Sequence, residues 1–131
     1  PRPSRVRGLM PVSGGYSLAE LPDEIDTPGP GQVRALLLNG ANPVASGPDG
    51  RALDRSLASL ELLVAIDLLQ RESHRHAHWI IPAAHFLERE ELHVYLHSLG
   101  DMPFIQSSRA VVPLPETMIP DWEFLMRLGD A

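Results

Sequence analysis

The chain has 131 residues, of which 44% are hydrophobic and 21% charged, and this composition is typical of a single globular domain. It contains no cysteine, which excludes disulfides, thiolate nucleophiles, iron–sulfur ligation and zinc-finger sites within this segment. The net charge of −6 opposes nonspecific nucleic-acid binding, and no apolar run approaches the length of a membrane span.

All 11 cationic residues are arginines, so Schiff-base chemistry, lysine general bases and the G-x-x-x-x-G-K-[ST] phosphate loop are also excluded for this segment. The chain begins with Pro1 rather than Met, and no signal-peptide core follows. We therefore expect it to be an excised piece of a longer protein. The compartment stays open, with the cytoplasm favoured over the periplasm.

Proline and glycine are concentrated in residues 1–31, which predicts an incoming linker or surface segment ahead of a domain formed by residues 32–131. Inside this segment a short helix is expected around Ser17–Ile25, and Pro22 limits its length.

The first regular element is predicted at Val33–Leu38, an almost wholly apolar run typical of a strand buried on both faces of a parallel sheet. It ends in the turn formers Asn39–Pro43. An amphipathic helix is predicted over Arg51–Leu60, because three leucines share one helical face. They are Leu53, Leu57 and Leu60.

Two further strands are predicted, at Leu62–Ile66, which Asp67 closes, and at Trp79–Ile81, which Pro82 stops. The order strand, helix, strand, strand predicts an open α/β sheet with a right-handed crossover.

The last fifty residues are less regular. Phe86–Leu99 is compatible with a helix by composition or with an extended loop. Ala110–Val112 is a strand candidate, and a last helix is expected to begin at Asp121 and to stop at Gly129.

Ligands of open α/β sheets bind beyond the carboxyl ends of the strands. Here those ends are Asn39–Pro43, Asp67 and Pro82–Arg89. The Asp67 carboxylate is suited to accept hydrogen bonds from a ribose hydroxyl, or from the N1–H and amino group of guanine. The alternative is that Asn42 and Pro43 form only a turn and that Asp67 is a strand-end cap. The loop is not G-x-G-x-x-G, so the standard nicotinamide fingerprint is absent.

Two charged residues further along have a similar double interpretation. Arg89 lies in a cluster of acidic and basic residues that is usually just a solvated face. If the cluster lies at the strand ends, Arg89 is the natural cation for a phosphate. Asp121 is a favourable partner of a helix dipole, or a carboxylate that reads a purine edge.

Three alternating histidines, His74, His76 and His78, suggest a metal site if they lie on one strand face. The segment lies between two elements and no fourth ligand is evident, so solvent-facing histidines are the favoured interpretation.

The ordered motifs LLLNGANPVAS, LLVAIDLLQRESHRHAHWIIPAAHFLERE and PDWEFL resemble the third domain of molybdopterin oxidoreductases of the dimethyl-sulfoxide reductase and formate dehydrogenase type. The resemblance covers about residues 30–128. It departs from the family pattern at His78, where Asp is common, and at Glu91–Tyr95, which replaces an E-G-T stretch.

This resemblance implies a Rossmann-like, mainly parallel sheet with helices on both faces, which cradles one of two molybdopterin guanine dinucleotides that hold molybdenum or tungsten. The cofactor is expected in the full-length protein and not in the isolated fragment. The resemblance implies cofactor contacts at Gly40, Asn42 and Pro43 along the nucleotide, at Ile66 and Asp67 facing the guanosine, at Arg89, and at Asp121 on guanine.

No catalytic residue and no metal ligand is expected in this segment, because in such enzymes both lie in other domains. The implied partners are those other domains and an iron–sulfur electron-transfer protein. Two alternatives remain open: a cofactor-less structural subunit of the same fold, as in the large peripheral subunit of respiratory complex I, and an independent nucleotide- or metal-binding module.

Overall fold

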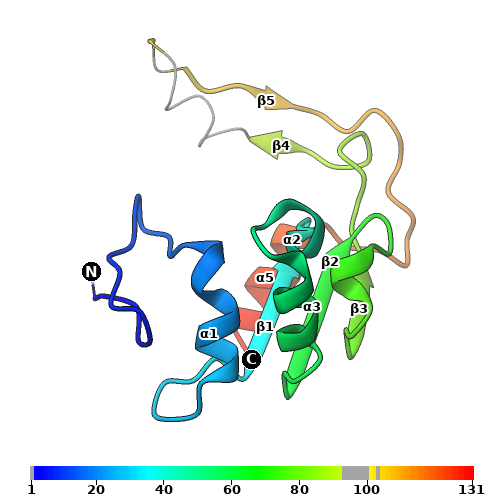
Figure 1. Ribbon diagram of the computed structural model, residues 1–131. Coiled ribbons are helices and arrows are strands. Elements are labelled where there is room, and N and C mark those ends of the chain that lie inside the picture. The colour runs from blue at the N-terminus through cyan, green and yellow to red at the C-terminus, as the bar shows by residue number, and fades with distance from the viewer. Residues whose placement is uncertain (1, 93–100, 103) are drawn as a thin grey trace. The chain divides into compact units, whose positions relative to one another are not determined.

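The computed structural model describes residues 2–92, 101–102 and 104–131 (Figure 1). Two compact units divide the chain, Pro1–Ile81 and Pro82–Ala131. None of the helices in the described part of the chain is long and apolar enough to cross a membrane.

The first unit begins with the 3-10 helix η1 (Leu18–Glu20) and helix α1 (Leu21–Asp26), which confirm the short helix expected around Ser17–Ile25. Pro22 lies in the first turn of α1, where a backbone N–H has no intrahelical partner and a proline therefore costs nothing.

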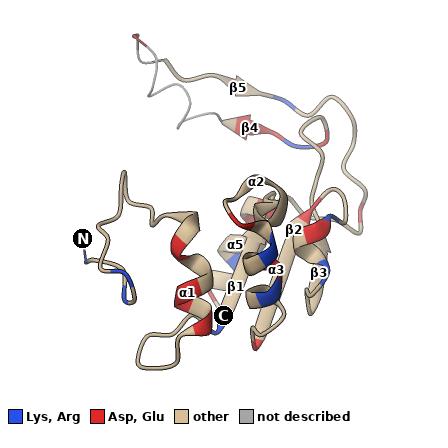
Figure 2. Cartoon of the chain, in the orientation of Figure 1, with Lys and Arg blue, Asp and Glu red and all other residues tan. Residues whose placement is uncertain are grey.

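Ion pairs and hydrogen bonds tie the segment ahead of η1 to the acidic residues of these two helices, which Figure 2 shows in red. The hydroxyl of Ser4 donates to the buried carboxylate of Glu20 at 2.7 Å. Arg5 contacts Glu24 at 3.2 Å. The segment therefore packs on the helices of its own unit, and the boundary expected after residue 31 stays a prediction.

A three-stranded sheet forms the centre of the first unit, in the order β1 (Ala35–Asn39), β2 (Leu62–Asp67) and β3 (Trp79–Pro82). Strands β1 and β2 run parallel, in a register from Ala35 opposite Leu62 to Asn39 opposite Ile66. All three predicted strands are present, with ends shifted by no more than two residues. The predicted open α/β architecture is confirmed.

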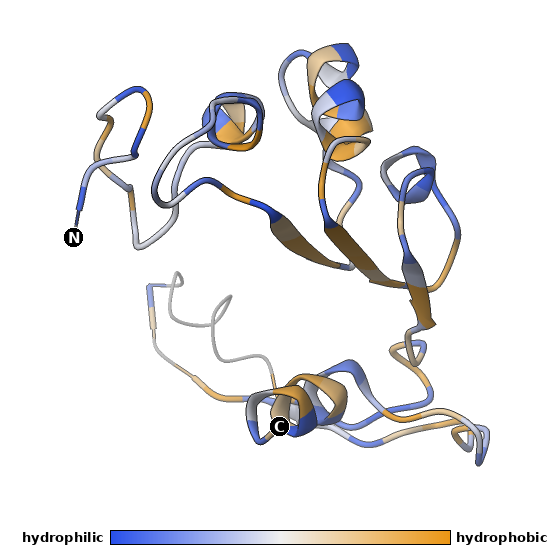
Figure 3. Cartoon of the chain, turned by 90° about the horizontal axis from the view of Figure 1, so that it is seen from below, coloured by the Kyte–Doolittle hydropathy of each residue, from blue (hydrophilic) through white to orange (hydrophobic). Residues whose placement is uncertain are grey.

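Helices α2 (Pro43–Ser46) and α3 (Gly50–Leu57) and the 3-10 helix η2 (Glu72–His74) complete the unit. Together with α1 they lie on one face of the sheet (Figure 3). The core fills the space between these helices and that face. Its buried members are Ile25, Leu38, Leu53, Leu57, Leu60, Leu63 and Ala65.

Burial along β1 differs from the prediction of a strand buried on both faces. Leu38 is 6% exposed but its neighbour Leu37 is 36% exposed. Successive side chains of a strand point to opposite faces, and the helices of this unit cover one of them. The predicted leucine face is confirmed, although α3 ends at Leu57 and Leu60 is buried from the following turn.

The second unit contains a two-stranded antiparallel ladder, β4 (Glu91–Leu92) with β5 (Ser107–Ser108), and helix α5 (Asp121–Gly129). The last helix is confirmed from its predicted start to its predicted stop. Phe86–Leu99 contains no helix in its described part, residues 86–92, and the rest lies outside the described residues.

The strand predicted at Ala110–Val112 is wrong. The backbone N–H groups of Val111 and Val112 both donate to the carbonyl of Leu87, at 2.7 and 2.9 Å. A single carbonyl that receives two consecutive N–H groups closes a bend, because a strand would direct them to opposite sides.

Candidate functional site

Parallel strands bring their carboxyl ends to one edge of the sheet, and at this edge of the first unit five predicted site residues meet: Gly40, Asn42, Pro43, Ile66 and Asp67. The N–H of Gly40 donates to the carbonyl of Ile66 at 2.8 Å. Gly40 has a φ of 60°, a left-handed conformation that glycine adopts without cost, and it lets the chain turn directly after β1.

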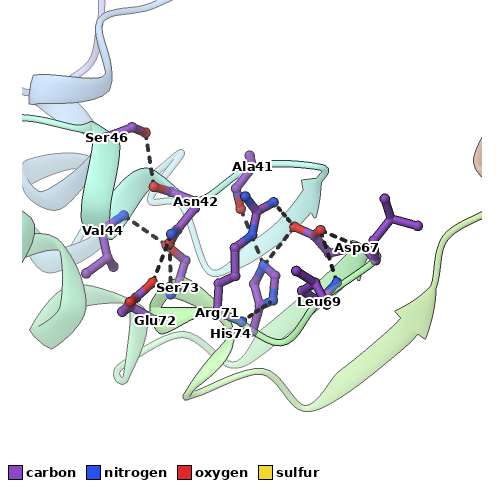
Figure 4. A network of polar contacts seen from close by, with 11 residues as sticks. Ala41, Asn42, Val44, Ser46, Asp67, Leu69, Arg71, Glu72, Ser73 and His74 are labelled. Carbon is purple, nitrogen blue, oxygen red and sulfur yellow. Dashed lines mark hydrogen bonds and ion pairs between the residues drawn. The ribbon is translucent and has the colours of Figure 1, made fainter. Parts of the chain in front are cut away.

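Asn42 ties the loop after β1 to η2 (Figure 4). Its Nδ2 donates to Glu72 Oε2 at 2.9 Å, and its Oδ1 accepts the hydroxyl of Ser73 at 2.7 Å. The same Ser73 oxygen accepts the N–H of Val44 at 2.9 Å. Because Ser73 is fully buried, this network fixes the loop conformation rather than offering free donors to a ligand.

The carboxylate of Asp67 lies at the end of β2 and is 6% exposed. Its Oδ1 accepts the N–H of Leu68 at 2.7 Å and that of Leu69 at 3.5 Å. Its Oδ2 forms a close ion pair with Arg71 and lies 3.5 Å from Nε2 of His74. Burial alone raises the pKa of Asp67, but the Arg71 and backbone hydrogen bonds outweigh it and hold that pKa below its usual value.

His74 is a buried structural residue. Its Nδ1 accepts the N–H of Arg71 at 3.2 Å, so the ring proton is on Nε2, which lies 3.3 Å from the carbonyl oxygen of Ala41. The imidazole thus joins the loop after β1 to the segment after β2.

The three histidines do not converge on a metal. His76 contacts Asp54 at 3.1 Å, and Nδ1 of His78 accepts the N–H of Leu63 at 3.0 Å. No group of three metal-ligating side chains occurs among the described residues. The expectation of solvent-facing rings holds for His78 and is wrong for His74, which is 1% exposed.

Arg71 is the functional candidate that the sequence reasoning missed. One terminal nitrogen pairs with Asp67, whereas Nε is buried and has no hydrogen-bond partner in the described part of the chain. The four-residue spacing from Asp67 gave no signal, because it brings side chains together on a helix and the segment between these two residues is not helical.

The second unit pairs the two remaining predicted residues, Arg89 and Asp121. The Arg89 guanidinium forms a close ion pair with Asp121 and contacts Glu91 Oε1 at 2.6 Å. Desolvation alone lowers the pKa of Arg89, but these carboxylates outweigh it and raise that pKa. Two carboxylates more than neutralise this cation, so the predicted phosphate contact would require one of them to move.

A groove of about 720 Å³ lies beside this cluster in the second unit. Two of its lining residues could hold a ligand: Trp122, which is 52% exposed, and Arg109. A planar ring can stack on the indole of Trp122, and an anion can pair with the guanidinium of Arg109. Its lining residues are Glu90, Glu91, Leu92, Ser107, Ser108, Arg109 and Trp122.

The depressed pKa of Asp67 predicts a specific acid sensitivity. The pKa of the folded state lies below the unfolded value of 3.8, so the stability from this carboxylate is complete above pH 3.8 and is lost as the pH falls through the lower folded value. Urea unfolding from about pH 5 to pH 2 should show wild type losing its advantage over Asp67→Asn in that acidic range. A constant difference between the two would contradict the ion pair.

Comparison with known proteins shows which proteins this chain is similar to. The chain matches the family model described as molybdopterin oxidoreductase over residues 12–131. It is 30% identical to the assimilatory nitrate reductase catalytic subunit of Bacillus subtilis over 89% of the chain and 15% of that relative. It is 26% identical to the F420-dependent formate dehydrogenase subunit alpha of Methanocaldococcus jannaschii over 98% of the chain and 20% of that relative.

A third relative, the nitrate reductase of Klebsiella oxytoca, is 28% identical over 98% of the chain and 15% of its own length. The chain thus spans about a fifth or less of these relatives. The family match covers nearly the whole chain, together with the strand-end loop and its aspartate. The chain belongs to the molybdopterin oxidoreductase family.

Proposed function

We propose that residues 32–131 form a cofactor-binding domain of a molybdenum or tungsten oxidoreductase with two molybdopterin guanine dinucleotides, similar to formate dehydrogenases and nitrate reductases. Residues 1–31 form the incoming segment. The observation that carries the proposal is the meeting of the Gly40–Pro43 loop and Asp67 at the carboxyl edge of a parallel sheet, the place where open α/β folds bind nucleotides.

The chemistry of this edge fits a guanosine group. Apart from its chain neighbours, none of the described residues lies within 4 Å of the position that a Cβ on Gly40 would take, so the loop backbone can be approached closely. The unpartnered Nε of Arg71 marks a polar site whose hydrogen bonding is incomplete within the described chain. The Asp67 carboxylate supplies the acceptor that the N1–H and amino group of guanine require.

In the proposed holoenzyme the metal and its dithiolenes carry out the redox chemistry, and the protein supplies binding and orientation. Asp67 would hold the guanine edge, and the backbone at Gly40 would follow the nucleotide. The network of Asn42 and Ser73 would keep that loop in place. In the second unit, Arg89 and Asp121 are the residues that we expect to contact the cofactor, with Arg89 exchanging one carboxylate for a phosphate.

The proposal assigns the activity of the whole protein to other domains. The curated relatives are about five times longer than this chain or more, and the metal ligand, the substrate site and the electron path would belong to those domains. The partners that we propose are those domains and an iron–sulfur electron-transfer protein. A cofactor-less structural subunit is the competing proposal, and the intact Asp67 and the open Gly40 loop favour the cofactor-binding one.

The test is the Asp67→Asn variant of the full-length protein, compared with Asp54→Asn. Asparagine presents an amide N–H where guanine needs an acceptor, so GMP released by acid hydrolysis should fall by about tenfold or more. Asp54 pairs with Arg75 and His76 on the surface, and its variant should retain wild-type GMP. Equal GMP in wild type and Asp67→Asn would remove Asp67 from the cofactor site.

A further inference from the structure

The Asp67 carboxylate already has close neighbours at both of its oxygens in this structure. A carboxylate offers about four lone-pair directions. The N–H groups of Leu68 and Leu69 occupy Oδ1, and Arg71 and His74 lie against Oδ2. Because Arg71 holds Oδ2 and the buried His74 ring lies 3.5 Å from the same oxygen, the paired N–H groups of a guanine edge can reach Asp67 only by replacing one of these neighbours.

Three of the four neighbours of the carboxylate are fixed. The N–H groups of Leu68 and Leu69 belong to the backbone turn that follows β2. The His74 side chain is fully buried and is held by the N–H of Arg71 and the carbonyl of Ala41. Displacing any of these groups would require the backbone after β2 or the buried His74 ring to move.

The Arg71 side chain is the exception. It is 35% exposed, whereas the carboxylate that it covers is 6% exposed. Its pairing is also incomplete, because Nε is buried without a partner among the described residues. A buried donor without a partner is unfavourable, so rotation of Arg71 into solvent would restore its hydrogen bonds while it uncovers Asp67.

The guanidinium group and the guanine base have the same hydrogen-bonding pattern. Both present planar N–H donors on either side of one carbon, a fork that matches the two oxygens of a carboxylate. The group that now covers Asp67 is therefore a chemical analogue of the N1–H and amino edge of guanine.

We propose that Arg71 is a placeholder on Asp67, which the guanine edge of a guanosine nucleotide displaces on binding. This inference rests on the proposed function and adds a residue that sets the affinity of the site. The Arg71–Asp67 pair keeps the buried carboxylate satisfied before binding, and its rupture is a cost that every incoming nucleotide meets.

The experiment measures the Kd of guanosine diphosphate for the cofactor-free form of the full-length protein, by calorimetry. Arg71→Met removes the competing donor, so the affinity should rise by about tenfold, the value of one charge-assisted hydrogen bond that no longer has to be broken. Arg71→Gln keeps one amide donor for Asp67 and should give a smaller rise. Arg71→Gln also provides the test if the Arg71→Met variant fails to fold.

Two controls isolate the effect. Arg71 and Arg75 flank the two ends of η2. The Arg75 side chain is 65% exposed and pairs with Asp54, so the Kd of the Arg75→Met variant should equal that of wild type. Asp67→Asn should abolish binding with Arg71 present or absent, since the shared acceptor is gone.

The outcomes separate the two proposals. If wild type binds the nucleotide but Arg71→Met and Arg71→Gln bind it no more tightly, the placeholder is contradicted and the proposed function stands. If no variant binds the nucleotide and the purified full-length protein releases no GMP, the proposed function is contradicted and the placeholder with it.

Discussion

Gly50→Ala is expected to destabilise the chain by about 3 kcal/mol, the upper end of the cost of forcing an extra methyl group into a packed interior. A Cβ at this position would lie 2.0 Å from the carbonyl oxygen of Val44 and 3.1 Å from its carbonyl carbon. Both are backbone atoms, which cannot turn aside as the end of a flexible side chain would. The first turn of α3 and the end of α2 must therefore move apart.

This displacement should also reach the candidate site, because the N–H of Val44 donates to Ser73 and Ser73 in turn donates to Asn42. Urea unfolding of the full chain measures the stability. Gly129→Ala is the matched control, since a Cβ there would meet no atom within 4 Å in the described part of the chain beyond its own helix, and it should change stability by no more than about 1 kcal/mol. Equal effects of the two substitutions would contradict the close approach of α2 and α3.

Leu57→Ala is expected to cost about 2–5 kcal/mol, the range for removing a large aliphatic side chain from a core that collapses only in part. Leu57 is 1% exposed at the end of α3 and belongs to the cluster that joins this helix to the sheet. The side chain has no route to solvent, so the cavity left behind stays largely empty.

Leu128→Ala makes the same chemical change in a helix of the second unit, at a side chain that is 54% exposed. Alanine is at least as good a helix former as leucine, and the loss should stay within about 0.5 kcal/mol. A Leu57→Ala loss as small as this would mean that the leucine face of α3 is not packed in the folded protein.

The periodic elements of the first unit were predictable because local patterning determines them. Apolar runs marked β1 and β2, and the spacing of Leu53 and Leu57 marked α3. Which face of a strand is covered depends on partners outside the strand. The exposure of Leu37 beside the buried Leu38 therefore required the structure.

The partners of the charged side chains were still harder to predict from the sequence. The sequence identified Arg89 and Asp121 as candidates but not as partners, because 32 residues separate them. For Asp67 it left two interpretations open, a ligand acceptor or a strand-end cap, and the carboxylate does accept the N–H groups of Leu68 and Leu69 that follow β2. The donors that cover it come from the turn after β2, whose geometry depends on the buried His74 and its contact with Ala41. The strand predicted at Ala110–Val112 was wrong for a similar reason, because the N–H of Val111 donates to the carbonyl of Leu87 and closes a bend.

The proposed function assigns this domain to an enzyme that holds two guanine dinucleotides around one metal. The most direct measurement is elemental analysis of the full-length protein together with quantification of GMP after acid hydrolysis. The proposed function predicts one molybdenum or tungsten and two GMP for each chain. Absence of both, in protein produced by a host that assembles the cofactor, would contradict it and favour the structural subunit.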